Sequence, residues 1–196
     1  ADKYRIPAMI LADGLLGQMM EPVSFPEINP DAYDKSGWAA CGHGNKREHH
    51  IINSLYLQAN ELEDKVKERF KRYETIKANE TDAELYLTDD CDILVCAYGA
   101  SARIVKSAIN SARAMGIKAG MFRPKTLWPF PVKELNKACE TASNLLCVEM
   151  SMGQMIDDVK LAINCSKPVS FFGRTGGVIP TPAEVLEEIK KIGGKN

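Results

Sequence analysis

All three histidines of the chain lie beside a cysteine in the stretch CGHGNKREHH, residues 41–50. Imidazole and thiolate groups are common zinc ligands, so this stretch is the first candidate for metal chemistry. The last two histidines are adjacent, so their side chains diverge on a helix or a strand, and the interval from His43 to His49 matches no common ligand spacing. Lys46 and Arg47 would also repel a dication. We therefore predict a solvated or partner-facing loop without a metal site.

Two glycine-containing turns are candidates for binding an anion. After the apolar run DILVCAYG, Ser101 is placed to cap a helix, whose N-terminal end attracts negative charge. A dinucleotide fingerprint would need three glycines at fixed spacing, and only Gly99 is present. After the run PVSFFG, Arg174 is suited to clamp a carboxylate or a phosphate. The alternatives are a turn that lets the helix pack closely and an arginine that bridges two loops.

Glu149, at the end of the run NLLCVEM, is a candidate acid or base if it is buried. The alternative is that its carboxylate caps the next helix or pairs across an interface. No serine or cysteine elbow with a matching base is present, so a hydrolase mechanism has no support. We assign no catalytic residue within this chain.

Composition excludes several classes of partner. The 196 residues carry 25 basic and 26 acidic side chains. This balance gives no broad positive electrostatic field that would attract nucleic acid or an anionic membrane. The six cysteines show no CxxC spacing and several lie in apolar runs, which indicates free thiols in a reducing cytoplasm. No apolar run reaches the roughly 18–20 residues of a membrane span, and no secretory signal is present.

Few helices and strands are predicted in the first part of the chain, up to about residue 79. Residues 8–12 form an apolar run typical of a buried strand, and residues 24–52 read as an irregular connector. A helix is predicted over residues 58–79, where apolar residues recur at steps of three and four at Leu62, Val66, Phe70, Tyr73 and Ile76. Because the opening strand has no preceding unit to pair with, we expect a C-terminal piece of a longer polypeptide.

From residue 90 onward, strand and helix patterns alternate. Such units predict a three-layer α/β/α sandwich with a mostly parallel sheet and helices on both faces. Four strands are expected in the runs DILVCAYG, IKAGMFRP, NLLCVEM and PVSFFG. The helix boundaries follow from capping signals, namely Ser101 with Gly116, Pro131 in a first turn, and Thr181 with Pro182 and Glu184.

A set of motifs carries a family resemblance. The junction MFRPKTLWPFPVKEL resembles the junction between a strand and a helix in the transketolase C-terminal-like domain. Three further stretches, ILADGLLGQMMEPV, VEMSMGQMIDDVKLAI and FFGRTGGVIPTP, are similar to the alpha subunit of the 2-oxoacid:ferredoxin oxidoreductases. Within that family, GHGNKREHHIINSLYL most resembles the branched-chain type, which acts on 2-oxoisovalerate.

The resemblance implies a reaction and a set of cofactors. The reaction is oxidative decarboxylation of a 2-oxoacid with coenzyme A, which gives acyl-CoA, carbon dioxide and reduced ferredoxin. Thiamine diphosphate with Mg²⁺ and iron–sulfur clusters serve the whole complex, and none is expected on this segment alone. The implied partners are a beta subunit that holds the diphosphate and ferredoxin-like subunits. The activating glutamate would lie upstream, so the segment alone should be inactive.

The resemblance also implies a domain layout. Residues 1–23 would be the end of a pyrimidine-binding domain, residues 24–82 a connector, and residues 83–196 the transketolase C-terminal-like domain. The connector loop would then line a substrate route or a subunit interface through His43, Lys46, Arg47 and His49. Two alternatives are a transketolase or 2-oxoacid dehydrogenase beta-type subunit without ferredoxin, and a non-catalytic oligomerisation or anion-binding module.

Overall fold

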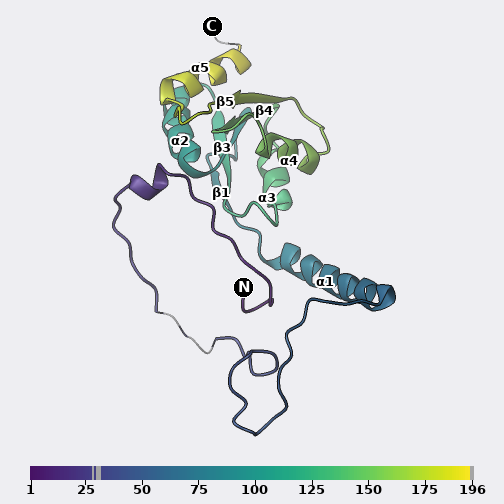
Figure 1. Ribbon diagram of the computed structural model, residues 1–196. Coiled ribbons are helices and arrows are strands. Elements are labelled where there is room, and N and C mark those ends of the chain that lie inside the picture. The colour runs from purple at the N-terminus through teal and green to yellow at the C-terminus, as the bar shows by residue number, and fades with distance from the viewer. Residues whose placement is uncertain (28, 30–31, 195–196) are drawn as a thin grey trace. The chain divides into compact units, whose positions relative to one another are not determined.

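The computed structural model describes residues 1–27, 29 and 32–194 (Figure 1). The chain divides into two compact units, of which the first comprises residues 1–11 and 20–76. The second comprises residues 12–19 and everything from residue 77 onward. None of the described helices is both long and apolar enough to cross a lipid bilayer.

A five-stranded sheet forms the centre of the second unit (Figure 1). The order across the sheet is β1-β3-β2-β4-β5, and only β1 runs antiparallel to its neighbour. The four predicted strands and the mostly parallel sheet are therefore confirmed. The strands are β1 (Ala83–Tyr86), β2 (Ile93–Ala97), β3 (Ala119–Pro124), β4 (Asn144–Glu149) and β5 (Val169–Gly173).

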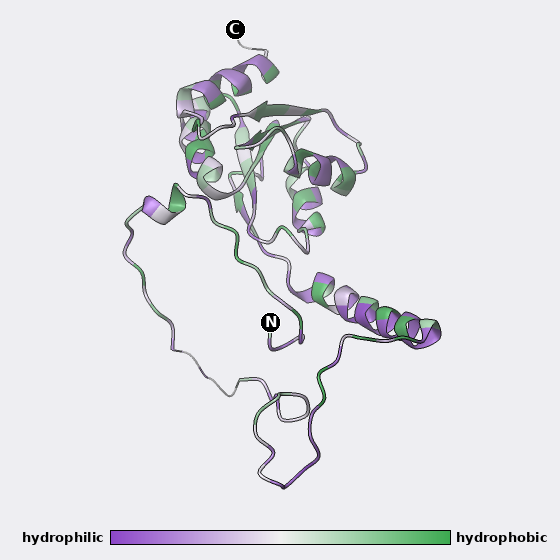
Figure 2. Cartoon of the chain, in the orientation of Figure 1, coloured by the Kyte–Doolittle hydropathy of each residue, from purple (hydrophilic) through white to green (hydrophobic). Residues whose placement is uncertain are grey.

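Helices cover both faces of this sheet, which gives the predicted three layers. Helices α2 (Gly99–Ala114) and α5 (Pro182–Ile192) pack together over one face. The other face carries α3 (Val132–Ala138) and α4 (Met155–Ala162). Along β2 the side chains alternate, with Val95 in the core under α2 and α5 and Cys96 in the core under α3 and α4. Strand β2, which is covered on both faces, is accordingly apolar throughout (Figure 2).

Capping residues were predicted correctly at α5 and at the C-terminal end of α2, and incorrectly at the N-terminal ends of α2 and α3. Gly116 follows the C-cap residue Met115 of α2 with a φ of +78°, as expected of a residue that closes a helix. Thr181 caps α5 in a capping box with Glu184, as expected. Helix α2 starts at Gly99, so Ser101 lies in its first turn and is not its cap. Gly99 has a φ of +55°, which lets the helix begin directly after the strand. Pro131 is the N-cap of α3 and not a residue of its first turn.

Strand β1 was not predicted from the sequence. Its four residues AELY alternate weakly and are only partly buried, so the local pattern is too short to identify. Long-range contacts hold it at the edge of the sheet. Glu84 accepts from Lys106 Nζ at 2.6 Å and from Arg123 Nη1 at 3.1 Å, and the Tyr86 hydroxyl donates to Asn110 Oδ1 at 2.7 Å.

The first unit has little regular structure. Residues 8–12 form no strand, and Met9 and Ile10 are 82 % and 95 % exposed, so that prediction was wrong. The physical reason is that no described strand lies beside this run, and an unpaired strand is not stable. Helix α1 (Ala59–Asn79) matches the predicted helix. Of its apolar stripe only Ile76 is buried, whereas Phe70 is 55 % exposed.

Candidate functional site

The carboxyl edge of the parallel strands is the most suitable place for a site in the second unit. After β2 the chain crosses to β3 on one side, and it then returns to β4 on the other side of β2. In open α/β sheets, ligands bind outside the carboxyl ends of the strands at such a change of direction. Helix α2 begins here after β2, and α4 begins here after β4.

Glu149 ends β4 at this edge, and its side chain is 1 % exposed. Its Oε2 accepts from the backbone N–H of Gln154 at 3.1 Å and of Met155 at 3.0 Å. The Ser151 hydroxyl also donates to Oε2 at 3.1 Å, and the Ile156 N–H donates to Oε1 at 3.0 Å. Four donors therefore surround one buried carboxylate.

These contacts decide between the two predicted roles of Glu149. The donors include the first backbone N–H groups of α4, which have no partner within the helix. The negative carboxylate also interacts favourably with the positive end of the helix. Because both oxygens are engaged, Glu149 caps the next helix, and its carboxylate does not face a substrate. Burial raises the pKa of the nearby Tyr98, and the charge of Glu149 adds to that rise.

The first turn of α2 lies at the same edge. Ser101 is buried in this turn, at 3 % exposure. Asp13 Oδ2 lies 3.6 Å from the position that a Cβ atom on Gly99 would occupy, and Asp13 Oδ1 accepts from the Leu16 N–H at 2.7 Å. The Asp13 carboxylate therefore lies beside the start of α2, which is where we predicted that an external anion binds. Asp13 was not identified from the sequence, because 86 residues (99 − 13) separate it from Gly99.

Arg174 follows β5 at the carboxyl edge. Its Nη2 donates to Glu184 Oε1, and its guanidinium lies 5.6 Å from the centre of the Phe172 ring. The Arg174 Nε is buried and has no hydrogen-bond partner. Thr181 and Arg174 donate to the Glu184 carboxylate, and both lower its pKa, with Thr181 contributing most. An external anion would have to compete with Glu184 for this arginine, so the anion contact stays a prediction.

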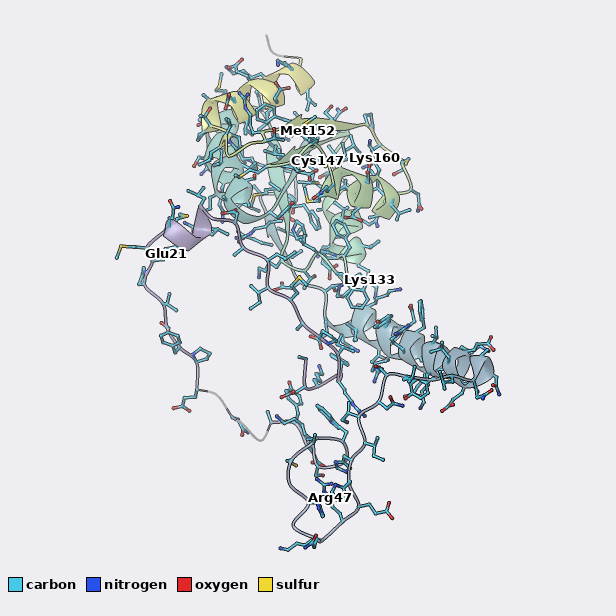
Figure 3. The ribbon with its side chains drawn as sticks, viewed as in Figure 1. Glu21, Arg47, Lys133, Cys147, Met152 and Lys160 are labelled. Carbon is cyan, nitrogen blue, oxygen red and sulfur yellow. The ribbon has the colours of Figure 1, made fainter. Side chains whose placement is uncertain are left out.

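The histidine-containing loop belongs to the first unit. The rings of His43 and His49 lie 4.0 Å apart between centroids. Arg47 Nη2 donates to the Cys41 carbonyl at 2.8 Å, so its side chain holds the loop closed (Figure 3). Lys46 is exposed. Among the described residues, no group of three His, Cys, Asp or Glu side chains is arranged to hold a metal ion.

The proline-rich corner after β3 is fixed at one end and exposed in its middle. Backbone N–H groups of Lys125 and Thr126 donate to the Asp82 carbonyl, at 2.9 and 3.2 Å. The Trp128–Pro129 peptide is cis. Phe130 packs on Phe122 with 6.1 Å between the ring centroids, whereas Trp128 is 53 % exposed. A cavity of about 540 Å³ opens beside the corner; it is lined by Lys77, Ala78, Thr81, Trp128, Pro129, Phe130, Val132, Lys133 and Glu134.

The predicted site residues therefore fall into two groups. Ser101 and Arg174 both lie at the carboxyl edge of the second unit. His43, Lys46, Arg47 and His49 lie together in one loop of the first unit. The structure adds Glu149 as a helix-capping carboxylate and Asp13 as a neighbour of the α2 start. No reacting centre with a nucleophile and a base is formed by these residues.

Comparison with known protein families and sequences gives consistent matches. Residues 91–185 match the family model of the pyruvate:ferredoxin oxidoreductase core domain II. The chain is 39 % identical over 196 residues to the ketoisovalerate oxidoreductase subunit VorB of Methanothermobacter marburgensis, covering 100 % of this chain and 55 % of that protein. It is 29 % identical over 229 residues to the 2-oxoglutarate synthase subunit KorA of the same organism, covering 96 % of this chain and 57 % of that protein.

The fold is also found in a solved structure, the 2-oxoglutarate:ferredoxin oxidoreductase from Magnetococcus marinus with 2-oxoglutarate, coenzyme A and succinyl-CoA bound. The TM-score is 0.59 at 19 % identity, over 70 % of this chain and 24 % of that chain. This likeness supports the fold assignment. The chain spans about half the length of the curated relatives that it matches.

Proposed function

We propose that the chain is part of the alpha subunit of a 2-oxoacid:ferredoxin oxidoreductase, because residues 91–185 match the family model of the pyruvate:ferredoxin oxidoreductase core domain II. The observation that carries this proposal is the 39 % identity to a ketoisovalerate oxidoreductase subunit along the whole chain. Identity to the 2-oxoglutarate synthase subunit is lower, at 29 %. The difference favours a branched-chain 2-oxoacid, 2-oxoisovalerate, as the substrate.

The proposed reaction joins the acyl group of the 2-oxoacid to coenzyme A. The carbon–carbon bond to the carboxylate breaks and releases carbon dioxide, the acyl group forms a thioester with the sulfur of coenzyme A, and ferredoxin accepts the electrons. Thiamine diphosphate supplies the stabilisation of the carbanion when it is bound. Of the carboxyl-edge residues described above, Glu149 binds the start of α4 and Arg174 binds Glu184, and we assign no step of this reaction to either.

We propose that thiamine diphosphate and its Mg²⁺ are bound outside the residues that the structure describes. Such a site needs carboxylate or carbonyl oxygens that are free to bind the metal ion. Glu149 is the one buried carboxylate in the described part of the chain, and α4 uses both of its oxygens. The proposal therefore places the cofactor outside these residues, with the diphosphate on a beta subunit and the iron–sulfur clusters on ferredoxin-like subunits. Six free cysteines agree with a cytoplasmic location.

An activity assay of the complete native complex tests this proposal. The complex is supplied with coenzyme A, a viologen dye as electron acceptor, and one of three substrates, namely 2-oxoisovalerate, 2-oxoglutarate or pyruvate. We expect dye reduction that depends on coenzyme A and is fastest, by kcat/KM, with 2-oxoisovalerate. Faster reduction with 2-oxoglutarate would reject the branched-chain assignment. Dye reduction with none of the three would reject the proposed reaction.

The loop of residues 41–50 has a proposed role at a subunit interface or along the substrate route. Lys46 carries this proposal, because it is exposed while Arg47 is used within the loop. In the complete complex, Lys46→Ala should weaken subunit association or raise the KM for the 2-oxoacid. Lys71→Ala removes an exposed lysine from α1 and serves as the control. If both variants assemble and turn over like the wild type, the loop has neither role.

A further inference from the structure

Strand β5 (Val169–Gly173) ends the sheet on the side opposite β1. Among the residues that the structure describes, β5 pairs with β4 alone. An edge strand exposes a row of backbone N–H and C=O groups that another strand can pair with, and most proteins protect such an edge with charges, prolines or a bulge. The two edges of this sheet differ in this respect.

Strand β1 is protected by charge. It has four residues, and Glu84 in its middle forms ion pairs with Lys106 and Arg123. Strand β5, with the sequence VSFFG, contains no charged residue and no proline. The two cations that flank it are engaged within the same unit. Lys167 Nζ donates to the carbonyls of Cys139 and Ala142, and Arg174 binds Glu184.

The hydrogen bonds to β4 determine which groups of β5 face outward. The Leu145 N–H donates to the Pro168 carbonyl at 3.0 Å, and the Arg174 N–H donates to the Glu149 carbonyl at 3.1 Å. Backbone groups of successive residues in a strand point alternately to either side. Residues with even numbers, such as Ser170 and Phe172, therefore face β4. The N–H and C=O groups of Val169, Phe171 and Gly173 face away from it.

We infer that β5 is the interface of a two-fold dimer, in which it pairs antiparallel with β5 of a second copy of this chain. The pairing is centred on Phe171, which lies opposite Phe171 of the second copy, and Val169 lies opposite Gly173. In an antiparallel ladder, opposed residues exchange both of their N–H···O=C bonds when these groups face each other. In this register, the outward N–H and C=O groups of Val169, Phe171 and Gly173 each face the corresponding groups of an opposed residue in the second copy.

Four observations favour a second copy over a different partner strand. A two-fold interface must be complementary to itself, and the outward groups of β5 are symmetric about Phe171. The strand has no charge, so two copies do not repel each other. Phe171 is 36 % exposed and would gain an aromatic neighbour from the second copy. Gly173 adds no side chain opposite Val169, and a Cβ atom at this position would clash with the Ser151 carbonyl oxygen.

The test measures self-association of the full chain and does not depend on the proposed reaction. Analytical ultracentrifugation from about 10 µM to about 1 mM should show a monomer–dimer equilibrium. Hydrogen exchange should show protection of the Phe171 and Gly173 amides that increases with protein concentration. The Phe172 amide should be protected at every concentration, because it faces β4.

Matched lysine substitutions at the two edges complete the test. Phe171→Lys puts a charge at the dimer axis and should raise the dimer Kd by about tenfold or more. Leu85→Lys is the control, because Leu85 lies on the opposite edge strand β1 and is similarly exposed, at 37 %. The dimer Kd of this variant should equal that of the wild type. Circular dichroism confirms that both variants are folded. The inference is wrong if the wild type stays monomeric at about 1 mM, or if its Phe171 amide exchanges at one rate at all concentrations.

Discussion

At the scale of single residues, Glu149 is the side chain whose role the structure defines most sharply. Its buried carboxylate accepts four hydrogen bonds around the start of α4. Glu149→Gln replaces one oxygen by an NH₂ group, which cannot accept from the backbone donors. We expect the free energy of unfolding to fall by about 2–4 kcal/mol, measured by urea denaturation.

The control for this change is Glu140→Gln at an exposed position. It should alter the free energy of unfolding by no more than about 0.5 kcal/mol. Equal stability of the two variants would show that the carboxylate of Glu149 does not hold α4 in place.

The thiols provide a second prediction at the residue scale. Cys41 and Cys165 are exposed, whereas Cys91, Cys96, Cys139 and Cys147 are buried. Burial raises the pKa of Cys139 to about 11 and also raises that of Cys91. Cys96 lies opposite Cys147 in the ladder between β2 and β4, and hydrogen bonding with Cys147 raises the Cys96 pKa. All of these shifts disfavour the reactive thiolate.

We therefore expect two of the six cysteines to react with iodoacetamide in the native chain, and all six to react in denaturant. Mass spectrometry of the labelled chain identifies the modified positions. Rapid native labelling of Cys96 or Cys147 would show that the core beneath α3 and α4 opens readily, contrary to its burial.

At the scale of elements, β1 depends on an ion-pair cluster that responds to pH. Hydrogen bonding from Lys106 is the main cause of a lowered Glu84 pKa, and Arg123 adds to it. A carboxyl whose pKa is lower when folded stabilises the fold above its unfolded pKa, near 4.5, and loses this effect as the pH falls through the folded value. At neutral pH, Glu84→Gln should cost about 0.5–1 kcal/mol.

This cost should shrink as the pH falls below about 4.5, because the wild-type carboxyl becomes protonated as well. The measurement is the difference in free energy of unfolding between variant and wild type at several pH values. Glu61→Gln on α1 is the control, because no ion pair is found for Glu61 among the described side chains. A difference that is constant between neutral and acid pH would contradict the role given to Glu84.

At the scale of the whole molecule, we propose that the proline-rich corner around Trp128 and Phe130 docks onto another subunit of the complete complex. Phe130 packs on Phe122 in the core of the second unit, while Trp128 is largely exposed. Phe130→Ala should lower the free energy of unfolding by about 2–4 kcal/mol, because it leaves a cavity. Trp128→Ala should change stability less and weaken association within the complete complex, which size-exclusion chromatography measures. If Trp128→Ala leaves assembly unchanged, the corner is not a docking surface.

The sequence by itself determined the elements that depend on neighbouring residues. Apolar runs of five or six residues identified β2, β3, β4 and β5, and the residues TPAE identified the start of α5, because a capping box is complete within four positions. The motifs around LWPFP also indicated the family.

Only the tertiary structure decided the features that join distant parts of the chain. Strand β1 forms because β3 lies beside it, Asp13 reaches the start of α2, and residues 8–12 form no strand because none of the described strands lies beside them. Glu149 was recognised as a candidate, but its role depended on its burial and on which donors face its carboxylate. A local pattern gives the propensity of a segment, whereas the role of a polar side chain depends on the groups that folding brings to it.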